Sequence, residues 1–493
     1  MLTKWLNRFL WFYIIAMLAV GCHIYGIVVN ANGDNVEHLH TSWLIWQGKV
    51  PYKDFFQHHN PLTWYLSAPF VAALINNPHI FAIFNILGVF MLYFIAFYHY
   101  KIFLLNKDDK IMAMFVVAVV VSSYSLLWST DYRPDTFMFV CFFMGLYYLF
   151  EFAKSSSQKS LNISFIAFFL GFMFTQKILM HLIVPAILVV YWLMLKKITI
   201  KQFIKAIIVP LIGFGLFILW LHHHQMIELY WQSNFIFNQY IPKIFEQQRI
   251  VYPPTEYIEY YIFLPIAAIA AVYFLLKGNT LERTYSLMFF VEACFKLFYF
   301  SAFLHYIVFW LMLSIMLTAM LIEKLPKGKK ICYGLLCTYL LFMVYYNYHT
   351  TYAVEDQARL SKTGHEYAFN VLTPCDYAIN GYYATYNLKA KDAGYYTILL
   401  GQIDVLGEKV GIAPKDNLNE LVRTKLPKLV SAGVFWNTYW EQRGKRIPVH
   451  QIEPALINTY YDYTGLGDLH ILKPQYQKHY CVYNGKEWKY MDE

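Results

Sequence analysis

The chain has 493 residues, of which 58% are hydrophobic and only 14% charged, against the roughly 25% charged residues of a soluble domain. This composition excludes a water-soluble globule, because such a fold could not hide so much apolar surface. The formal net charge is +9 at pH 7. Since the lysines and arginines concentrate in connections between apolar segments, we interpret the charge as a signal of membrane topology and expect no nucleic acid partner.

Long apolar runs recur along the first part of the chain. Roughly 20 apolar residues in a helix cross the hydrocarbon core and satisfy their own backbone hydrogen bonds. The first run follows Lys4 and Arg8, as a signal peptide would, but no clean small-residue cleavage site comes after it. We therefore expect a polytopic α-helical membrane protein with about eleven transmembrane helices. They are expected near 9–29, 79–99, 111–128, 136–153, 161–176, 178–195, 206–222, 258–276, 284–301, 303–322 and 331–348.

The distribution of positive charge predicts the orientation. With the N-terminus inside, seventeen lysines and arginines fall in the inner connections and six in the outer ones before residue 349. Lys and Arg are retained on the cytoplasmic side of a membrane. An odd number of spans then places residues 349–493 outside.

The predicted topology gives two domains. Residues 1–348 form a transmembrane domain whose outer loops, 30–78 and 223–257, are rich enough in Trp, Tyr and Pro to suggest short helices at the membrane surface. Residues 349–493 have a soluble composition and are expected to form a small extracytoplasmic α/β domain. Its candidate elements are a strand at 395–401, a helix at 417–432 and a strand in LHILK at 469–473.

Two cysteines, Cys375 and Cys481, fall in the outer domain, while the other five fall in expected spans. An oxidising compartment would allow the two to pair, and we expect a disulfide between them. Two free thiols remain the alternative, since sequence spacing does not fix their distance.

The densest polar chemistry lies in the first outer loop. Acids, histidines and aromatic residues are interleaved there, which an ordinary solvated loop would not explain. The chemistry-bearing residues are Asp34, Glu37, His38, His40, Asp54, His58 and His59.

This loop also carries a resemblance. The run D-x-x-x-H-L-H, followed by Trp and by G-x-V-P-Y-K-D-F-F-Q-H-H-N-P-L, resembles the first periplasmic loop of polytopic GT-C glycosyltransferases. That superfamily includes the protein O-mannosyltransferases, the lipid A aminoarabinose transferases and a bacterial group using polyprenyl-phosphate sugars. Weaker motifs agree in order: D-Y-R-P-D at 131–135, F-T-Q-K at 174–177 and the Lys296 to Tyr306 segment ending in H-Y. The resemblance covers residues 1 to about 348, and the tail matches only in position and size.

The resemblance implies a GT-C-like transmembrane catalytic domain in a bacterial inner membrane, with its active site and the C-terminal domain facing the periplasm. It implies a donor that is a polyprenyl-phosphate-linked sugar and an acceptor hydroxyl on a lipid such as lipid A in lipopolysaccharide, on another cell-envelope polysaccharide or on protein. Neither the sugar nor the acceptor can be read from the residues. Many members have Asp-Glu where this chain has Asp34 and Asn35, so the role of the second acid passes to Glu37 or Asp54 or is lost.

The reaction needs a base for the acceptor hydroxyl and cations for the phosphate leaving group. We predict Asp34 as the base, with Asp54 as the other candidate acid, and a single displacement that inverts the anomeric centre. Basic residues at membrane depth are costly and often functional; the predicted phosphate-binding residues are Arg133, Lys177, Lys296 and His305. Snorkelling of the cations and helix packing by the histidine are the structural alternatives.

We expect Glu37, His38, His58 and His59 of the first outer loop to contact the substrate, and we call this part of the chain the substrate loop. Its histidines could also bind a metal ion. His38 and His40 do not share a helix face, and His58 and His59 point apart in any regular structure. A divalent cation would need a carboxylate, as in the set Asp34, His38 and His58, so a metal cofactor is left open. The rival function is a lipid or sugar transporter or flippase without transferase activity, although transporters usually place polar sites at the midplane.

Overall fold

The computed structural model describes residue 21 and the ranges 33–106, 109–123, 125–126, 132–240, 258–298, 308–328, 330–331, 334–335, 337–346, 366–379, 388–395, 416–431, 439–442, 445–448, 452–466, 469–483 and 488–491. Residue contacts divide the chain into two compact units. Unit 1 comprises Met1–Ile27, Ile86–Leu219 and Gln248–Ala353, and unit 2 comprises Val28–Asn85, Trp220–Gln247 and Val354–Glu493. The expected boundary at residue 348 stays a prediction.

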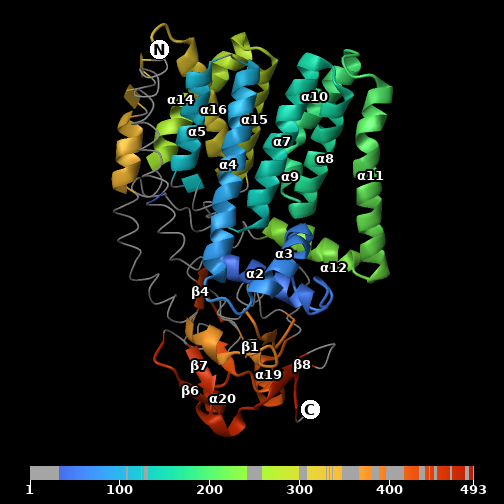
Figure 1. Ribbon diagram of the computed structural model, residues 1–493, viewed down its shortest axis with the longest axis vertical. Helices are drawn as coiled ribbons and strands as arrows, with labels where there is room; N and C mark the ends of the chain where they lie inside the picture. The colour runs from blue at the N-terminus through green and yellow to red at the C-terminus, as the bar shows by residue number, and fades with distance from the viewer. Residues whose placement is uncertain are drawn as a thin grey trace. The chain divides into compact units, whose positions relative to one another are not determined.

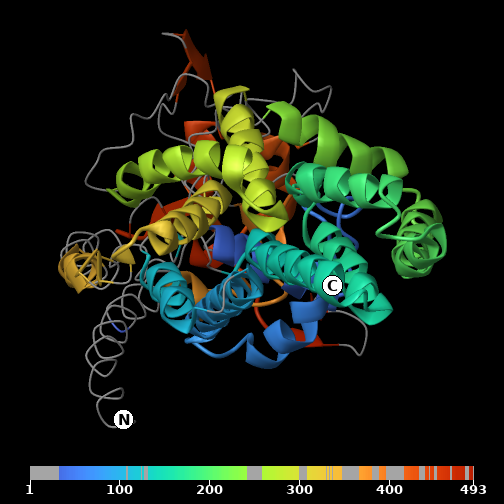
Figure 2. The same ribbon diagram turned by 90° about the horizontal axis from the view of Figure 1, so that it is seen from above.

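Unit 1 is a bundle of apolar helices (Figure 1). α7 packs along α8, α14 along α15 and α16, and α10 against α15, and the view from above shows the bundle down its helices (Figure 2). Its helices are α4 (Ile80–Asn106, continuing from unit 2), α5 (Lys110–Ser122), α7 (Pro134–Ser155), α8 (Gln158–Phe174), α9 (Ile178–His181), α10 (Ile183–Met194), α11 (Ile200–His223, continuing into unit 2), α14 (Ile258–Lys277), α15 (Thr280–Phe298), α16 (Val308–Lys324) and the helical stretch Cys337–Tyr346.

Four of the described helices are long and apolar enough to cross a membrane: α4, α7, α11 and Glu259–Lys277 within α14. Shorter apolar helices accompany them. Helices overlap every expected span from 79–99 onward, and the first, 9–29, falls outside the described residues except for residue 21. The mostly helical, membrane-spanning part of the predicted fold class is thus confirmed, while the count of eleven stays a prediction.

Local sequence explains how α7 and α8 meet. Pro134 occupies the first turn of α7, where its missing N–H costs nothing. Gly145 and Gly171 allow close helix approach, since a Cβ at Gly145 of α7 would come within 2.5 Å of Phe168 on α8, and one at Gly171 of α8 within 3.3 Å of Cys141 on α7. This packing brings the start of α7 close to the end of α8.

Unit 2 begins with helices from the first outer loop. α2 (Gly33–Trp46) packs against α3 (Leu62–Leu74). A second segment contributes α12 (Ile227–Trp231), which runs directly into a single π-helical turn, η1 (Gln232–Phe237). Such π-turns often occur at functional sites.

The C-terminal region of unit 2 contains a five-stranded mixed sheet in the order β2-β1-β3-β7-β6. β1 is parallel to β2 and β3, whereas β7 is antiparallel to β3 and β6. The elements are β1 (Tyr377–Ile379), β2 (Lys391–Asp392), α19 (Leu418–Lys425), β3 (Leu429–Ser431), β4 (Tyr439–Gln442) paired with β5 (Lys445–Pro448), α20 (Pro454–Tyr460), β6 (Tyr461–Tyr463), β7 (Leu469–Leu472), the 3-10 turn η4 (Pro474–Tyr476), and β8 (Cys481–Tyr483) paired with β9 (Trp488–Tyr490).

One expected element is wrong in extent. The helix predicted over 417–432 ends at Lys425, because Leu426 adopts a left-handed conformation with φ 44° and Pro427 cannot continue a helix. The remaining residues enter β3 instead. The strand expected at 469–473 is β7, and of 395–401 only Tyr395 is described.

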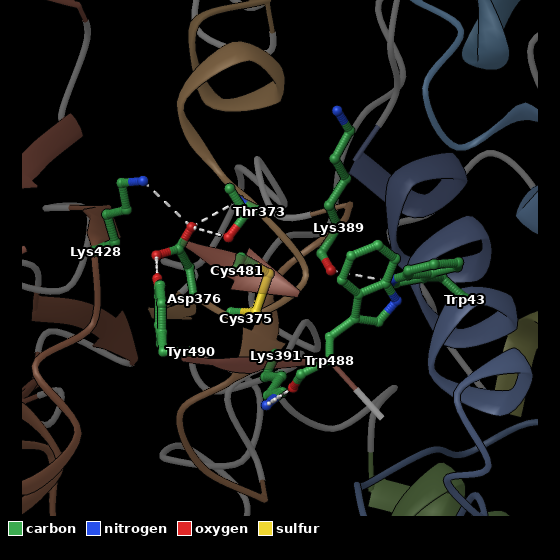
Figure 3. The surroundings of a disulfide bond; sticks show 10 residues. All are labelled: Trp43, Thr373, Cys375, Asp376, Lys389, Lys391, Lys428, Cys481, Trp488 and Tyr490. Carbon is green, nitrogen blue, oxygen red and sulfur yellow. Dashed lines mark hydrogen bonds and ion pairs between the residues drawn. A yellow bond between two sulfur atoms is a disulfide. The ribbon is translucent and has the colours of Figure 1, made fainter. Parts of the chain in front are cut away.

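A covalent and polar cluster joins the start of β1 to the C-terminal hairpin (Figure 3). Cys375 and Cys481 form a disulfide with their Cα atoms 5.7 Å apart. The neighbouring Asp376, only 4% exposed, accepts hydrogen bonds from Thr373 and Tyr490 and pairs with Lys428 at 3.3 Å. The strand β1 is therefore fixed to β3, β8 and β9 by side chains as well as by the sheet.

Candidate functional site

Three of the predicted phosphate-binding residues, Arg133, Lys177 and Lys296, lie at helix ends in unit 1. Arg133 is the N-cap of α7, and Asp135 lies in the first turn, where a carboxylate is stabilised by the helix dipole. Both are buried, at 7% and 5% exposure. The R-P-D part of this motif thus begins a membrane helix with a cation at the N-cap and an acid two residues later.

Lys177 comes to the same place from the T-Q-K segment. α8 ends at Phe174, and Thr175 turns the chain before α9 begins after Lys177. The Lys177 ammonium lies 3.0 Å from Asp135 Oδ1 and 3.3 Å from Oδ2. Two motifs that lie 42 residues apart in sequence are therefore joined by an ion pair.

Lys296 approaches from α15. Its ammonium lies 4.0 Å from Glu292 Oε2, one helical turn earlier, and is within electrostatic range of Lys177. The other Glu292 oxygen, Oε1, lies 2.7 Å from His181 Nδ1. We call Arg133, Asp135, Lys177, His181, Glu292 and Lys296 the ion cluster.

The ion cluster holds three permanent cations and two acids in largely apolar surroundings. The His181 ring lies against Phe309, with centroids 4.0 Å apart, and near Phe139 and Phe142. Buried charges of this kind are stable only when paired. Among the described members of the cluster the cations outnumber the acids, so a phosphate can bind here, with the lysines exchanging a carboxylate for a phosphate oxygen.

Sequence reasoning missed His181 and Glu292. The sequence does contain a feature that could have identified Glu292 as a site residue. It is a carboxylate inside an expected span, and it lies four residues before Lys296, which places both on one helix face. His181 follows Lys177 by the same spacing. His305 falls outside the described residues.

The predicted catalytic loop lies in unit 2. Asp34 is in the first turn of α2, and its side chain falls outside the described residues. Glu37 and His38 follow Asp34 in the sequence by three and four residues. Glu37 is 7% exposed and accepts a hydrogen bond of 3.0 Å from Gln57 Nε2.

The histidines of the substrate loop are held by defined partners. Trp64 Nε1 donates to His38 Nδ1 at 3.2 Å, which places the proton of neutral His38 on Nε2. His58 Nδ1 lies 2.9 Å from Asn238 Oδ1, the residue that directly follows η1. The first loop is therefore ordered by residues from the second.

One sequence argument about these histidines is wrong. We expected His58 and His59 to point apart, but their ring centroids are 4.2 Å apart. The reason is that residues 56–60 are neither helix nor strand, so neither regular alternation applies. His38 and His59 also meet, at 5.5 Å between centroids. Among the described residues, no group of three or more His, Cys, Asp or Glu is arranged to hold a metal ion.

The remaining acidic positions have local roles. Asp54 is exposed and accepts a 2.7 Å hydrogen bond from the Val50 N–H within its own turn. Asn35, at the position of the second acid in the motif that this loop resembles, is 1% exposed and hydrogen-bonded to Asn85. Position 35 therefore contributes to packing between α2 and the start of α4.

The C-terminal segment 388–395 is fastened to the first outer loop within unit 2. His40 is fully buried, with Nδ1 3.1 Å from the Leu388 carbonyl and Nε2 3.0 Å from Asp392 Oδ2. Burial lowers the pKa of His40, but the charge and hydrogen bond of Asp392 and the Leu388 carbonyl outweigh it, so the pKa is raised from 6.5. Trp43 adds a 2.7 Å hydrogen bond to the Lys389 carbonyl (Figure 3).

No protein-family model and no curated protein matches the chain. Solved structures do match. ArnT from Cupriavidus metallidurans, in its crystal structure bound to undecaprenyl phosphate, is 10% identical, with a TM-score of 0.52 over 86% of this chain and 93% of that chain. The apo state of the same protein gives the same values. The Archaeoglobus fulgidus oligosaccharyltransferase in complex with zinc and sulfate is 12% identical over 93% of this chain and 72% of that chain, with a TM-score of 0.45, which is too low to bear on the fold.

The similarity to ArnT extends over most of both chains and concerns the fold alone, because the sequence identity is so low. It agrees with the apolar helices and the C-terminal mixed sheet region described above. The chain is therefore a multi-pass membrane protein with a fold like that of ArnT.

Proposed function

We propose that this protein is a membrane glycosyltransferase that moves a sugar from a polyprenyl-phosphate donor to an acceptor hydroxyl at the outer face of a bacterial inner membrane. The observation that carries the proposal is the ion cluster, in which Arg133, Lys177 and Lys296 lie at helix ends, with Asp135 and Glu292 as the acids among its described members. The ArnT fold supports it, since ArnT has been crystallised with undecaprenyl phosphate.

In the proposed reaction, the acceptor oxygen attacks the anomeric carbon of the donor sugar. A new glycosidic carbon–oxygen bond forms while the bond from the anomeric carbon to the phosphate oxygen breaks, and its electron pair stays on the polyprenyl phosphate. The hydroxyl proton passes to Asp34, the proposed general base. A single displacement inverts the anomeric centre.

The cations act on the leaving group. A phosphate needs no general acid, because it is a weak base, but the negative charge that grows on it is stabilised by nearby ammonium and guanidinium groups. Lys177 and Lys296 are already oriented by Asp135 and Glu292, so little reorganisation is needed when the phosphate enters. His305 remains a candidate contributor from the sequence pattern, and Asp54 is the alternative to Asp34 as the base.

Reconstitution tests the function. Proteoliposomes with the full chain are given a panel of radiolabelled undecaprenyl-phosphate sugars and a cell-envelope extract as the source of acceptor. Label on an acceptor, with release of undecaprenyl phosphate, supports the transferase. Movement of labelled lipid across the bilayer without transfer would support the transporter and overturn the proposal.

The proposed orientation has its own test. A periplasmic reporter fused after residue 348 should be active only outside the cytoplasm, because an odd number of spans precedes that point. A cytoplasmic reporter that is active there instead would overturn the outer location of the C-terminal domain.

A further inference from the structure

A pocket lies in unit 1 among helix ends that take no part in the proposed reaction. The pocket has a volume of about 470 Å³ and is formed where α4, α7 and α10 end and α15 begins. Its size falls within the range of small-molecule sites in proteins. Four helices that are separate in sequence thus enclose one pocket.

The pocket and the ion cluster lie at opposite ends of the same helices. α7 carries Asp135 in its first turn and Lys154 in its last, and its 22 residues span roughly 33 Å at 1.5 Å per residue. α15 begins beside the pocket at Thr280 and reaches the ion cluster at Lys296. That separation matches the hydrocarbon thickness of a bilayer, so the pocket lies at the other membrane face. The charge distribution predicts this face to be cytoplasmic.

The charged residues of the described lining are cations. Lys154 and Lys197 line the pocket, and the described lining residues include no acid. The Lys154 ammonium donates to the Leu105 carbonyl, which holds it at the pocket. The nearby Glu282 is 1% exposed and paired with Lys324 at 3.5 Å, so its charge is already compensated.

The rest of the lining is largely apolar. Phe150, Phe152, Trp192 and Leu281 contribute, and Trp192 is 1% exposed with an indole N–H that has no hydrogen-bond partner in the described part of the chain. A ligand that matches this lining has a negatively charged head and an apolar tail. At a membrane face, that chemistry belongs to an anionic phospholipid.

We propose that this pocket binds an anionic phospholipid, with Lys154 and Lys197 contacting the phosphate and the aromatic residues contacting the first part of an acyl chain. Because the pocket lies at the far end of α7 and α15, the site is separate from the proposed donor site. Lipid bound there ties the ends of α4, α7, α10 and α15 together.

The test uses delipidated full-length protein in detergent, titrated with phosphatidylglycerol or phosphatidylcholine and followed by native mass spectrometry. We expect tighter binding of phosphatidylglycerol, and about tenfold weaker binding in the double variant Lys154→Gln, Lys197→Gln. The matched control Lys201→Gln, Lys205→Gln removes two exposed charges near the start of α11, outside the lining. It should bind like the wild type.

A third variant tests the proposal independently if the double variant folds poorly. Ser156 lines the pocket with φ 53°, a conformation that aspartate tolerates, so Ser156→Asp adds a negative charge with little strain. It should also weaken phosphatidylglycerol binding. Equal affinity for phosphatidylcholine, equal loss in the control variant, or displacement of the lipid by inorganic phosphate at matched concentration would each overturn the assignment.

Discussion

The ion cluster of unit 1 and the first outer loop of unit 2 use polar residues in different ways. In the ion cluster, acids and bases from different helices are paired, as in Asp135 with Lys177 and Glu292 with His181. In the outer loop, most polar contacts join neutral groups or a single charged partner, as in Gln57 with Glu37 and His58 with Asn238. Exchangeable charge pairs suit a site that receives a charged ligand, whereas fixed hydrogen bonds suit a loop that must keep its shape.

If the first outer loop supplies the base and the ion cluster supplies the cations, the largest loss of sugar transfer is expected from a substitution at Asp34. If this residue is the base, Asp34→Asn keeps the size but removes the proton acceptor, and transfer should fall about 10²- to 10⁴-fold. Transfer of radiolabelled sugar in proteoliposomes measures the loss, with membrane insertion checked separately.

Asp54→Asn is the matched control. The Asp54 carboxylate accepts a hydrogen bond from Val50 N–H within its own turn, and the amide oxygen of Asn can accept the same bond. Transfer should stay close to that of the wild type. If Asp54→Asn loses transfer while Asp34→Asn retains it, Asp54 is the base and the assignment of Asp34 is wrong.

The disulfide gives the next largest effect, on stability. Joining Cys375 to Cys481 closes a loop across a sequence separation of 106 residues. Replacing both with serine should lower the free energy of unfolding of the C-terminal region by about 2–4 kcal/mol. Thiol labelling of the wild type under denaturing, non-reducing conditions should leave both cysteines unmodified, and modification of both would refute the bond.

Charge removal in the ion cluster should have a smaller effect on a different kinetic parameter. Lys177→Ala and Lys296→Ala each remove a cation from the proposed donor phosphate, so the donor KM should rise by on the order of tenfold. Lys201→Ala, an exposed lysine on α11, is the control and should leave KM unchanged. An unchanged donor KM in both cluster variants would show that the donor phosphate does not bind at the ion cluster.

The smallest predicted effect is a pH dependence in unit 2. The pKa of His40 is raised in the folded protein, so its pairing with Asp392 stabilises the fold fully below the unfolded pKa and is lost as pH rises through the folded value. The stability advantage of the wild type over Asp392→Asn should therefore shrink as pH rises above about 6.5. Thermal unfolding of both proteins across that range measures it, and an advantage that grows with pH would contradict the charged form of His40.

Much of the helical architecture could be predicted because apolar runs and end signals are local. The D-Y-R-P-D and T-Q-K motifs mark a helix start and a helix end, where Arg133 and Thr175 serve as caps. The helix expected over 417–432 ends earlier, at Lys425, because Pro427 cannot continue a helix, and the spacing of its hydrophobic residues does not mark that end.

Long-range contacts could not be predicted from local sequence. The pairing of His40 with Asp392 joins residues 352 apart, and no periodicity in either segment marks the other as its partner. The approach of His58 to His59 depends on irregular backbone, which residue spacing does not describe. Glu292 was recognisable by its place in a span but not by its partner His181, which tertiary packing provides.

Direct binding of undecaprenyl phosphate tests the central claim, that the ion cluster of unit 1 holds the lipid phosphate of the donor. Native mass spectrometry of the wild type should show a bound lipid whose affinity falls at least tenfold in the double variant Lys177→Ala, Lys296→Ala. The control variant Lys201→Gln, Lys205→Gln, which changes two exposed lysines of α11, should bind it normally. Wild-type affinity in the cluster variant would contradict the account.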